Sequence, residues 1–193
     1  EKVDVVGPIC ETGDFLAQSP LRHGPFRVFY VGAIGAALGY TMQTTVAAWL
    51  MATLTPSAVM VALVQTASTA PALLFGLFAG AMADIVDRRK VIVATQVVLV
   101  AASALLGVAA IAGWVGPAML LAMTFVVGAG FAFYQPAQQA SVNDLVARAE
   151  MPQAVSLNAV GFNVSRAIGP AIAGALTALV GTASAPFASA ACF

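Results

Sequence analysis

The stretch Asp84-Ile85-Val86-Asp87-Arg88-Arg89-Lys90 places five charged residues between two long uncharged stretches of the chain. Residues 59–83 before it and residues 91–143 after it contain no Asp, Glu, Lys or Arg. A membrane-spanning helix needs about 20 predominantly apolar residues, which both stretches supply. A charged segment between two such stretches indicates a short loop at a membrane surface, so the sequence predicts an integral membrane protein.

The composition of the chain points to the same class. Of its 193 residues 61% are hydrophobic and only 8% are charged, and the mean hydropathy is +0.94. Soluble domains contain about 25% charged residues, so this composition does not fit a soluble globular protein. The formal net charge is zero, which gives no indication of a nucleic acid as partner. Cys10 and Cys192 lie near opposite ends and form no metal-ligand pattern, so we expect no metal and no cofactor.

The apolar stretches predict an all-α membrane protein with five complete spans and the start of a sixth. Residues 1–25 have no signal-peptide pattern and are expected to form a cytoplasmic N-terminal tail. The chain begins without Met and stops inside an apolar segment, so we expect a fragment that is truncated at both ends. The expected spans are residues 26–51, 57–83, 91–112, 117–140, 152–180 and the incomplete 185–193.

The basic residues predict the orientation of these spans. Arg22 precedes the first span and Arg27 lies at its very start, Arg88, Arg89 and Lys90 follow the second, and Arg148 follows the fourth. These positions are two spans apart, so all of them fall on one side of the membrane. Because cytoplasmic loops carry the excess of Lys and Arg, we expect a cytoplasmic N-terminus and a multi-pass protein of a bacterial cell membrane.

The charged loop has a functional interpretation beside the topological one. Asp84 ends the second span, where a nearby helix N-terminus would favour an anion. The arginines can pair with carboxylates of other loops, for which Asp144 and Glu150 are candidates. Topology alone would explain basic residues here, but not an Asp placed between a glycine-containing helix end and an Asp-Arg-Arg run. The residues predicted to form a cytoplasmic gate are Gly80, Asp84, Asp87, Arg88, Arg89 and Lys90.

The segment from Gly80 to Arg89 resembles the signature loop of the major facilitator superfamily, Gly-x-Leu-Ala-Asp-Arg-x-Gly-Arg-Arg/Lys. The residues that match are Gly80, Ala83, Asp84, Arg88 and Arg89, whereas Met82, Ile85 and Asp87 depart from it. The form Ala-Asp-x-x-Asp-Arg-Arg looks like the branch of enterobactin-exporter-like and drug or metabolite exporters. Further stretches that look like this branch are Trp49 to Ser57 and Tyr134-Gln135-Pro136-Ala137 running on to Asn158, Arg166 and Gly169-Pro170.

This resemblance covers about residues 26–193 and implies the N-terminal six-helix half of a transporter. Such transporters pair two six-helix halves, each built from three-helix inverted repeats, with the substrate site between the halves. The gate around Asp84 and Arg88 would lie between the halves, and Ile85 replaces a residue that usually contributes an ion pair. The resemblance thus implies a lipid bilayer, a small-molecule substrate and the missing C-terminal half as partners.

The fifth span contains a second pattern, Ser156-x8-Ser165-x3-Gly169-Pro170-x2-Ala173-Gly174. It resembles the Gly-Pro-containing fifth-helix signature of superfamily antiporters, which implies export rather than uptake. Pro170 removes one backbone hydrogen bond and predicts a kink. Gly169 and Gly174 leave a smooth face on which a partner helix can pack. A kinked helix with a packing role alone would show the same residues.

Apart from Arg27 at the start of the first span, Arg166 is the only charged residue within a predicted span. A charge there is costly, so the side chain should face the bundle interior or a wet cavity and have a partner. The candidate partners are a carbonyl, Asn158, Asn163, an anionic substrate or an acid in the missing half. The alternative is that Arg166 extends to the membrane interface.

Other polar residues in the spans can either line a pathway or bond to a neighbouring helix. We select Arg166, Asn158, Asn163, Gln43 and Gln65 as candidates for the transport pathway or for coupling. The remaining polar residues considered are Gln96, Tyr40 and Tyr134.

Together these features predict a membrane transporter, and the family resemblance implies a secondary active exporter of a small molecule that works by alternating access with proton antiport. The spans contain no nucleotide-binding loop and no catalytic Ser/His or Cys/His pair, so we expect no enzyme. A non-transporting membrane scaffold or receptor of the same fold remains the alternative function.

Overall fold

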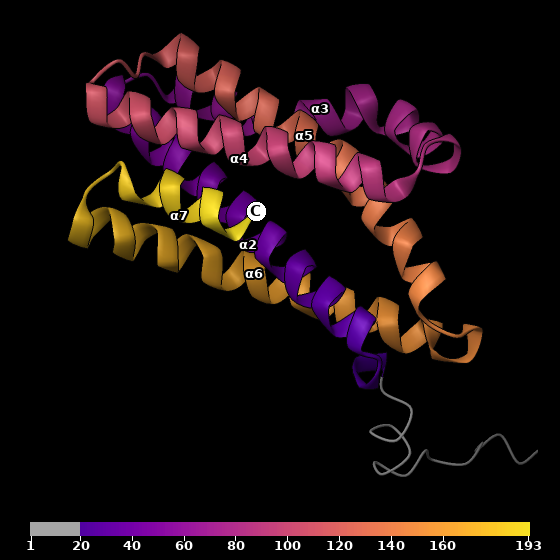
Figure 1. The fold of residues 1–193 in the computed structure, drawn as a ribbon. Helices are drawn as coiled ribbons and strands as arrows, with labels where there is room; N and C mark the ends of the chain where they lie inside the picture. Colours follow the sequence, from indigo (N-terminus) through magenta and orange to yellow (C-terminus); the bar gives the residue numbers. More distant parts are fainter. Residues whose placement is uncertain (1–19) are drawn as a thin grey trace, which may run out of the picture.

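The computed structural model describes residues 20–193, which form helices without any strand (Figure 1). Of the expected tail, residues 1–19, including Cys10, lie outside the described part of the chain. The side chain of Asp84 also lies outside the described side chains. A short 3-10 turn, Pro20–Arg22, is followed by α2 (Gly24–Leu54), α3 (Ala58–Ile85), α4 (Arg88–Ala112), α5 (Pro117–Leu145), a second 3-10 turn (Arg148–Glu150), α6 (Met151–Val180) and α7 (Ser184–Cys192).

The connection between α3 and α4 is much shorter than the sequence suggested. Only Val86 and Asp87 separate the two helices, so the prediction of a loop over residues 84–90 is wrong. The reason is a helix cap: the side chain of Asp87 accepts a hydrogen bond from the backbone N–H of Arg89 at 3.0 Å. This bond satisfies one of the free N–H groups at the helix start, so α4 begins at Arg88 and includes the three basic residues.

Four helical segments are long and apolar enough to cross a membrane: Ala58–Ala83, Arg88–Ala112, Pro117–Leu145 and Arg148–Val180. This finding confirms an all-α membrane protein. The expected first span, α2, is 31 residues long but is absent from this set. Its centre carries Thr41 and Gln43, which are 8% and 1% exposed, because α2 runs through the interior of the bundle. The expected incomplete sixth span corresponds to α7, which is nine residues long and ends at Cys192.

The two ends of the bundle differ in charge. The start of α2, the α3–α4 connection and the α5–α6 connection lie together on the right in Figure 1. These segments and the adjoining residues include Arg22, Arg27, Arg88–Lys90 and Arg148, and we call this end the charged end. The α2–α3, α4–α5 and α6–α7 turns lie at the opposite end and contain no Asp, Glu, Lys or Arg.

The helices form two sets of three, α2–α4 and α5–α7, and most of the packing is between the sets rather than within them. The most extensive contacts of α2 are with α6, and those of α5 are with α3. In the same way α7 packs on α2 while α4 packs on α5, and α4 and α7 contact each other. If α2, α3 and α4 are exchanged with α5, α6 and α7, respectively, the same set of contacts results. It is the packing expected of an inverted three-helix repeat.

Small residues allow the closest of these contacts. The buried stripe of α6 consists of Ala154, Gly161, Ser165, Gly169 and Ala173, mostly four residues apart. A Cβ on Gly169 would collide with the side chain of Thr41 on α2. Close approach of helix backbones through small residues is typical of membrane proteins. A partner helix was expected to pack on Gly169, and within the described chain this helix is α2.

The other two residues of the predicted packing motif in α6 lie on its exposed side. Gly174 has nothing within 4 Å of the position of an added Cβ, so the described chain offers it no partner helix. Pro170 is exposed, and α6 continues as one helix from Met151 to Val180 on either side of it.

The interior is packed most densely toward the uncharged turns. Met42, Val46, Leu50 and Met51 of α2 form a buried cluster there with residues of α3, α4, α5, α6 and α7. A smaller cluster around Phe26 closes the contact of α2, α5 and α6 at the charged end. The candidate site lies between these two clusters.

Candidate functional site

A cavity of about 450 Å³ lies between α2, α5 and α6. It lies alongside the N-terminal part of α2, the C-terminal part of α5 and the N-terminal part of α6, which places it in the half of the bundle nearer the charged end. None of its lining residues is charged at neutral pH. They are Tyr30, Ala33, Ile34, Ala37, Phe131, Tyr134, Gln135, Gln138, Gln139, Ala140, Val142, Asn143, Val155, Asn158, Ala159 and Phe162.

The α5 wall of the cavity is a row of amide side chains. Gln135, Gln139 and Asn143 follow one another at four-residue spacing, and Gln138 stands beside them, so all lie on one face of the helix. The Nε2 atom of Gln138 lies 3.5 Å from Oδ1 of Asn158 on α6, a long contact that connects the two walls. Amide groups both donate and accept hydrogen bonds, so this wall can bind uncharged polar groups of a solute.

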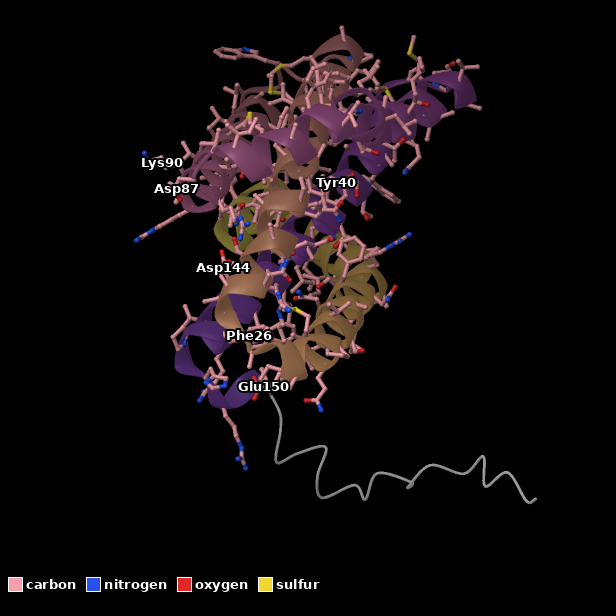
Figure 2. All side chains as sticks on the ribbon, turned by 90° about the vertical axis from the view of Figure 1, so that its right-hand side faces the viewer. Phe26, Tyr40, Asp87, Lys90, Asp144 and Glu150 are labelled. Atoms are coloured by element: carbon pink, nitrogen blue, oxygen red, sulfur yellow. The ribbon has the colours of Figure 1, made fainter. Side chains whose placement is uncertain are left out.

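Aromatic rings form the inner end of the cavity, toward the middle of the bundle. Tyr40 is stacked on Phe131 with 4.0 Å between ring centroids. Phe131 in turn lies 5.8 Å from Tyr134 and 6.5 Å from Phe162, again between centroids. Tyr40 is held in place because its hydroxyl donates to the carbonyl of Ser68 at 3.1 Å. We call Tyr40, Phe131, Tyr134 and Phe162 the aromatic cluster; Tyr40 is labelled in Figure 2.

The cavity opens between α5 and α6. These two helices are consecutive in the chain but scarcely touch, because each packs mainly on a helix of the other set. Gln139 and Asn143 on α5, and Val155 and Ala159 on α6, are exposed. The opening is therefore lateral, on a face of the bundle rather than at its charged end.

The predicted pathway residues are distributed over three environments. Asn158 is part of the cavity wall. Asn163 and Arg166 are exposed on α6; Nδ2 of Asn163 donates to the carbonyl of Ala159, and the guanidinium carbon of Arg166 lies 5.9 Å from the centroid of the Phe162 ring. Gln43 and Gln65 do not line the cavity.

Gln43 and Gln65 lie outside the cavity wall for different reasons. Gln43 is 1% exposed because α7 covers it, and its Oε1 accepts a hydrogen bond from Ser189 at 2.7 Å. Gln65 is exposed on α3, a helix that contributes nothing to the cavity wall. Gln96, on α4, is likewise absent from the wall.

Five polar wall residues were missed by the sequence analysis: Tyr30, Gln135, Gln138, Gln139 and Asn143. A signal for four of them was present. Four amide residues within 135–143, spaced so that they share a helix face, are unusual in a membrane span. The expected span ended at residue 140, three residues too early to show the whole row. Tyr30 carries no such signal.

At the charged end an ion pair connects α4 with α5. Nη1 of Arg88 lies 2.5 Å from Oδ2 of Asp144 and also donates to the carbonyl of Ala140 at 3.0 Å, both on α5. Asp144 is thus the partner of Arg88, as expected for one of the two candidate carboxylates. The other, Glu150, lies 3.3 Å from Nε2 of His23 instead. Figure 2 views this end, with Asp87, Lys90, Asp144 and Glu150 labelled.

Three of the predicted gate residues line a shallow groove at this end. Asp87, Arg88 and Arg89 line it together with Asp144 and Phe29. Lys90 is exposed, and Gly80 is half-buried in the last turns of α3, with nothing within 4 Å of an added Cβ. The structure therefore brings the basic residues of α4 and the end of α5 together beside the start of α2.

We expect the two partners of the Arg88–Asp144 pair to contribute unequally to stability. Asp144 is 66% exposed, and exposed ion pairs contribute about 0–1 kcal/mol. Asp144→Asn should therefore lower the thermal unfolding midpoint by a few degrees at most. Arg88→Gln should lower it more, because the bond to the Ala140 carbonyl is lost as well. The midpoints can be measured by circular dichroism in detergent, with Lys90→Gln as a charge-matched control; a larger effect of Asp144→Asn would contradict the geometry.

The chain was compared with known proteins. No curated protein matches it. A family model described as transmembrane secretion effector matches residues 16–193, which is most of the chain. The six-helix arrangement and the four apolar spans agree with that family's all-α membrane fold. The chain therefore belongs to the transmembrane secretion effectors, a family of major facilitator superfamily transporters.

Proposed function

We propose that this chain is the N-terminal half of an exporter and that a small molecule crosses the membrane along the cavity between α2, α5 and α6. The observation that carries the proposal is the cavity itself. A volume of about 450 Å³ falls within the range of small-molecule sites, and the wall combines apolar and aromatic surface with a few hydrogen-bonding groups. Polar groups at membrane depth are tolerated where they line such a cavity.

The lateral opening supports a second half of the transporter on that side. In transporters built from two six-helix halves the substrate site lies between the halves. The opening between α5 and α6 would be closed by the C-terminal six helices, and rocking of the two halves would expose the cavity to each side of the membrane in turn. The groove around Arg88 and Asp144 would then form part of the gate at the charged end.

The distribution of basic residues supports the proposed orientation. The connections and adjoining helix turns at the charged end carry Arg22, Arg27, Arg88, Arg89, Lys90 and Arg148, and the connections at the other end carry none. By the positive-inside rule the charged end is cytoplasmic, in the cell membrane of a bacterium. Export would start from that side, and the solute would be driven outward by proton antiport.

The test uses the full-length carrier reconstituted in proteoliposomes with an imposed proton gradient. We expect the charged end to face the side from which solute is taken up, and flux to stop when an ionophore removes the gradient. Candidate solutes are those that accumulate in cells lacking the gene. A carrier that folds but moves none of them would favour a scaffold or receptor. Flux that persists without the gradient would contradict proton antiport alone.

A further inference from the structure

We infer that the exported solute is an organic anion with a planar apolar part, which binds with its charge on Arg166 and its apolar part against the aromatic cluster. This inference rests on the proposed function and specifies the class of its substrate. It starts from the position of one cation. Arg166 lies at the middle of the 30-residue helix α6 and is the only charged residue of the described helices away from their ends.

The position of the guanidinium connects it to the cavity. Its central carbon lies 5.9 Å from the centroid of the Phe162 ring, and Phe162 is itself part of the cavity wall. A cation at this distance from an aromatic face is attracted to it. The guanidinium therefore lies beside the part of the cavity wall formed by Phe162, one helical turn along α6 from Phe162 and two turns from Asn158.

Arg166 makes no ion pair with any described side chain. The ion pairs found in residues 20–193 are Arg88–Asp144 and His23–Glu150, both at the charged end. An unpaired cation at membrane depth is costly, and a planar guanidinium presents five donors that suit a carboxylate, sulfonate or phosphate. Since Arg166 is exposed on this half, these donors are available to a group that enters from the open side.

The rest of the wall carries no anionic side chain and presents flat apolar surface. No Asp or Glu is among the residues that line the cavity, so the wall offers a cation no opposite formal charge. Beside Arg166 the wall rings of Phe162, Phe131 and Tyr134 form a continuous series with centroid separations of 6.5 and 5.8 Å. A ring system of a solute can stack on this surface while its anionic group reaches the guanidinium.

The test compares three probes that share a naphthalene ring and carry a negative, a neutral or a positive substituent: 2-naphthalenesulfonate, 2-naphthalenesulfonamide and 2-naphthyltrimethylammonium. The full-length carrier in a neutral detergent is titrated with each, and the thermal unfolding midpoint and the binding isotherm are recorded. We expect saturable binding and a raised midpoint with the sulfonate, and at least tenfold weaker binding of the other two. Dihexanoyl-phosphatidylglycerol is titrated in parallel, because a lipid headgroup is the other source of an anion.

Variants assign the selectivity to Arg166. Arg166→Gln should weaken sulfonate binding about tenfold or more and leave sulfonamide binding unchanged, and Arg166→Lys should retain part of the preference. Arg148→Gln removes an exposed cation of the charged end that neither lines the cavity nor contacts the aromatic cluster, and it serves as the matched control. The midpoint of each unliganded variant shows whether it is folded.

Several outcomes would overturn the inference. One is equal binding of the three probes or binding of none, and another is preference for phosphatidylglycerol over the sulfonate. The third is a lower unfolding midpoint of unliganded Arg166→Gln together with equal loss of binding of all three probes. This result would indicate that Arg166 pairs with an acidic residue of the other half instead of with the solute. Failure of the proposed function is distinct from these, since it would appear as absent flux in proteoliposomes whatever the charge of the solute.

Discussion

Gly128→Ala is expected to destabilise the protein by about 3 kcal/mol, the upper end of the usual cost of overpacking, and to lower its unfolding midpoint by roughly 6–12 °C. Gly128 lies where α5 crosses α3 most closely. An added Cβ would lie 2.5 Å from the carbonyl oxygen of Ser68 and 3.2 Å from that of Ala67. Both obstacles are backbone atoms, so no side-chain rotation relieves them. The Ser68 carbonyl is also held by the hydroxyl of Tyr40.

Gly76→Ala is the matched control for this prediction. Gly76 lies on α3 within a membrane-spanning segment, as Gly128 does on α5, but has nothing within 4 Å of an added Cβ. Replacing an unobstructed helical glycine by alanine gains up to about 1 kcal/mol of helix propensity. Its midpoint should therefore stay the same or rise. Equal midpoints for the two variants, measured in one detergent, would show that α3 and α5 are not in contact at Gly128.

The sequence predicted the class and the number of helices well because membrane insertion imposes length and apolarity directly on the chain. The stretch 91–143, without a charge, admits little else than two spans joined by the Gly116-Pro117 turn. Boundaries near charges were less predictable. Arg88, Arg89 and Lys90 look like loop residues, yet the cap formed by Asp87 makes them the first turn of α4.

The site was less predictable because polar residues of a membrane helix look alike until their neighbours are known. Gln43 and Gln138 are both glutamines in long helices, and both are buried. Gln43 bonds to Ser189, 146 residues away, whereas Gln138 reaches Asn158 across a cavity. The difference comes from which helices pack together, and only the three-dimensional arrangement shows that α7 covers one and that α5 and α6 diverge at the other.

The second prediction is that Ala159→Trp abolishes transport without destabilising the protein. Ala159 lies on α6 in the cavity wall and is exposed at its opening. An indole there is small compared with a cavity of about 450 Å³, so it can be accommodated without moving the helices. It would occupy the space between the amide row of α5 and Asn158. A solute that uses this cavity would then be excluded, whatever its charge.

Ala101→Trp is the control for the same change of side chain. Ala101 is exposed on α4, a helix that contributes no residue to the cavity wall. We expect this variant to keep both its unfolding midpoint and its transport rate. An added Trp therefore tests the cavity rather than the tolerance of the bundle for a large apolar residue.

The central claim is that solute crosses the membrane along the cavity between α2, α5 and α6. Its most direct test is the initial rate of solute flux by Ala159→Trp, Ala101→Trp and the unaltered full-length carrier, reconstituted at equal density in proteoliposomes. The predicted result is background flux for Ala159→Trp, with an unchanged unfolding midpoint, and normal flux for Ala101→Trp. Normal flux through the Ala159→Trp carrier would contradict the claim.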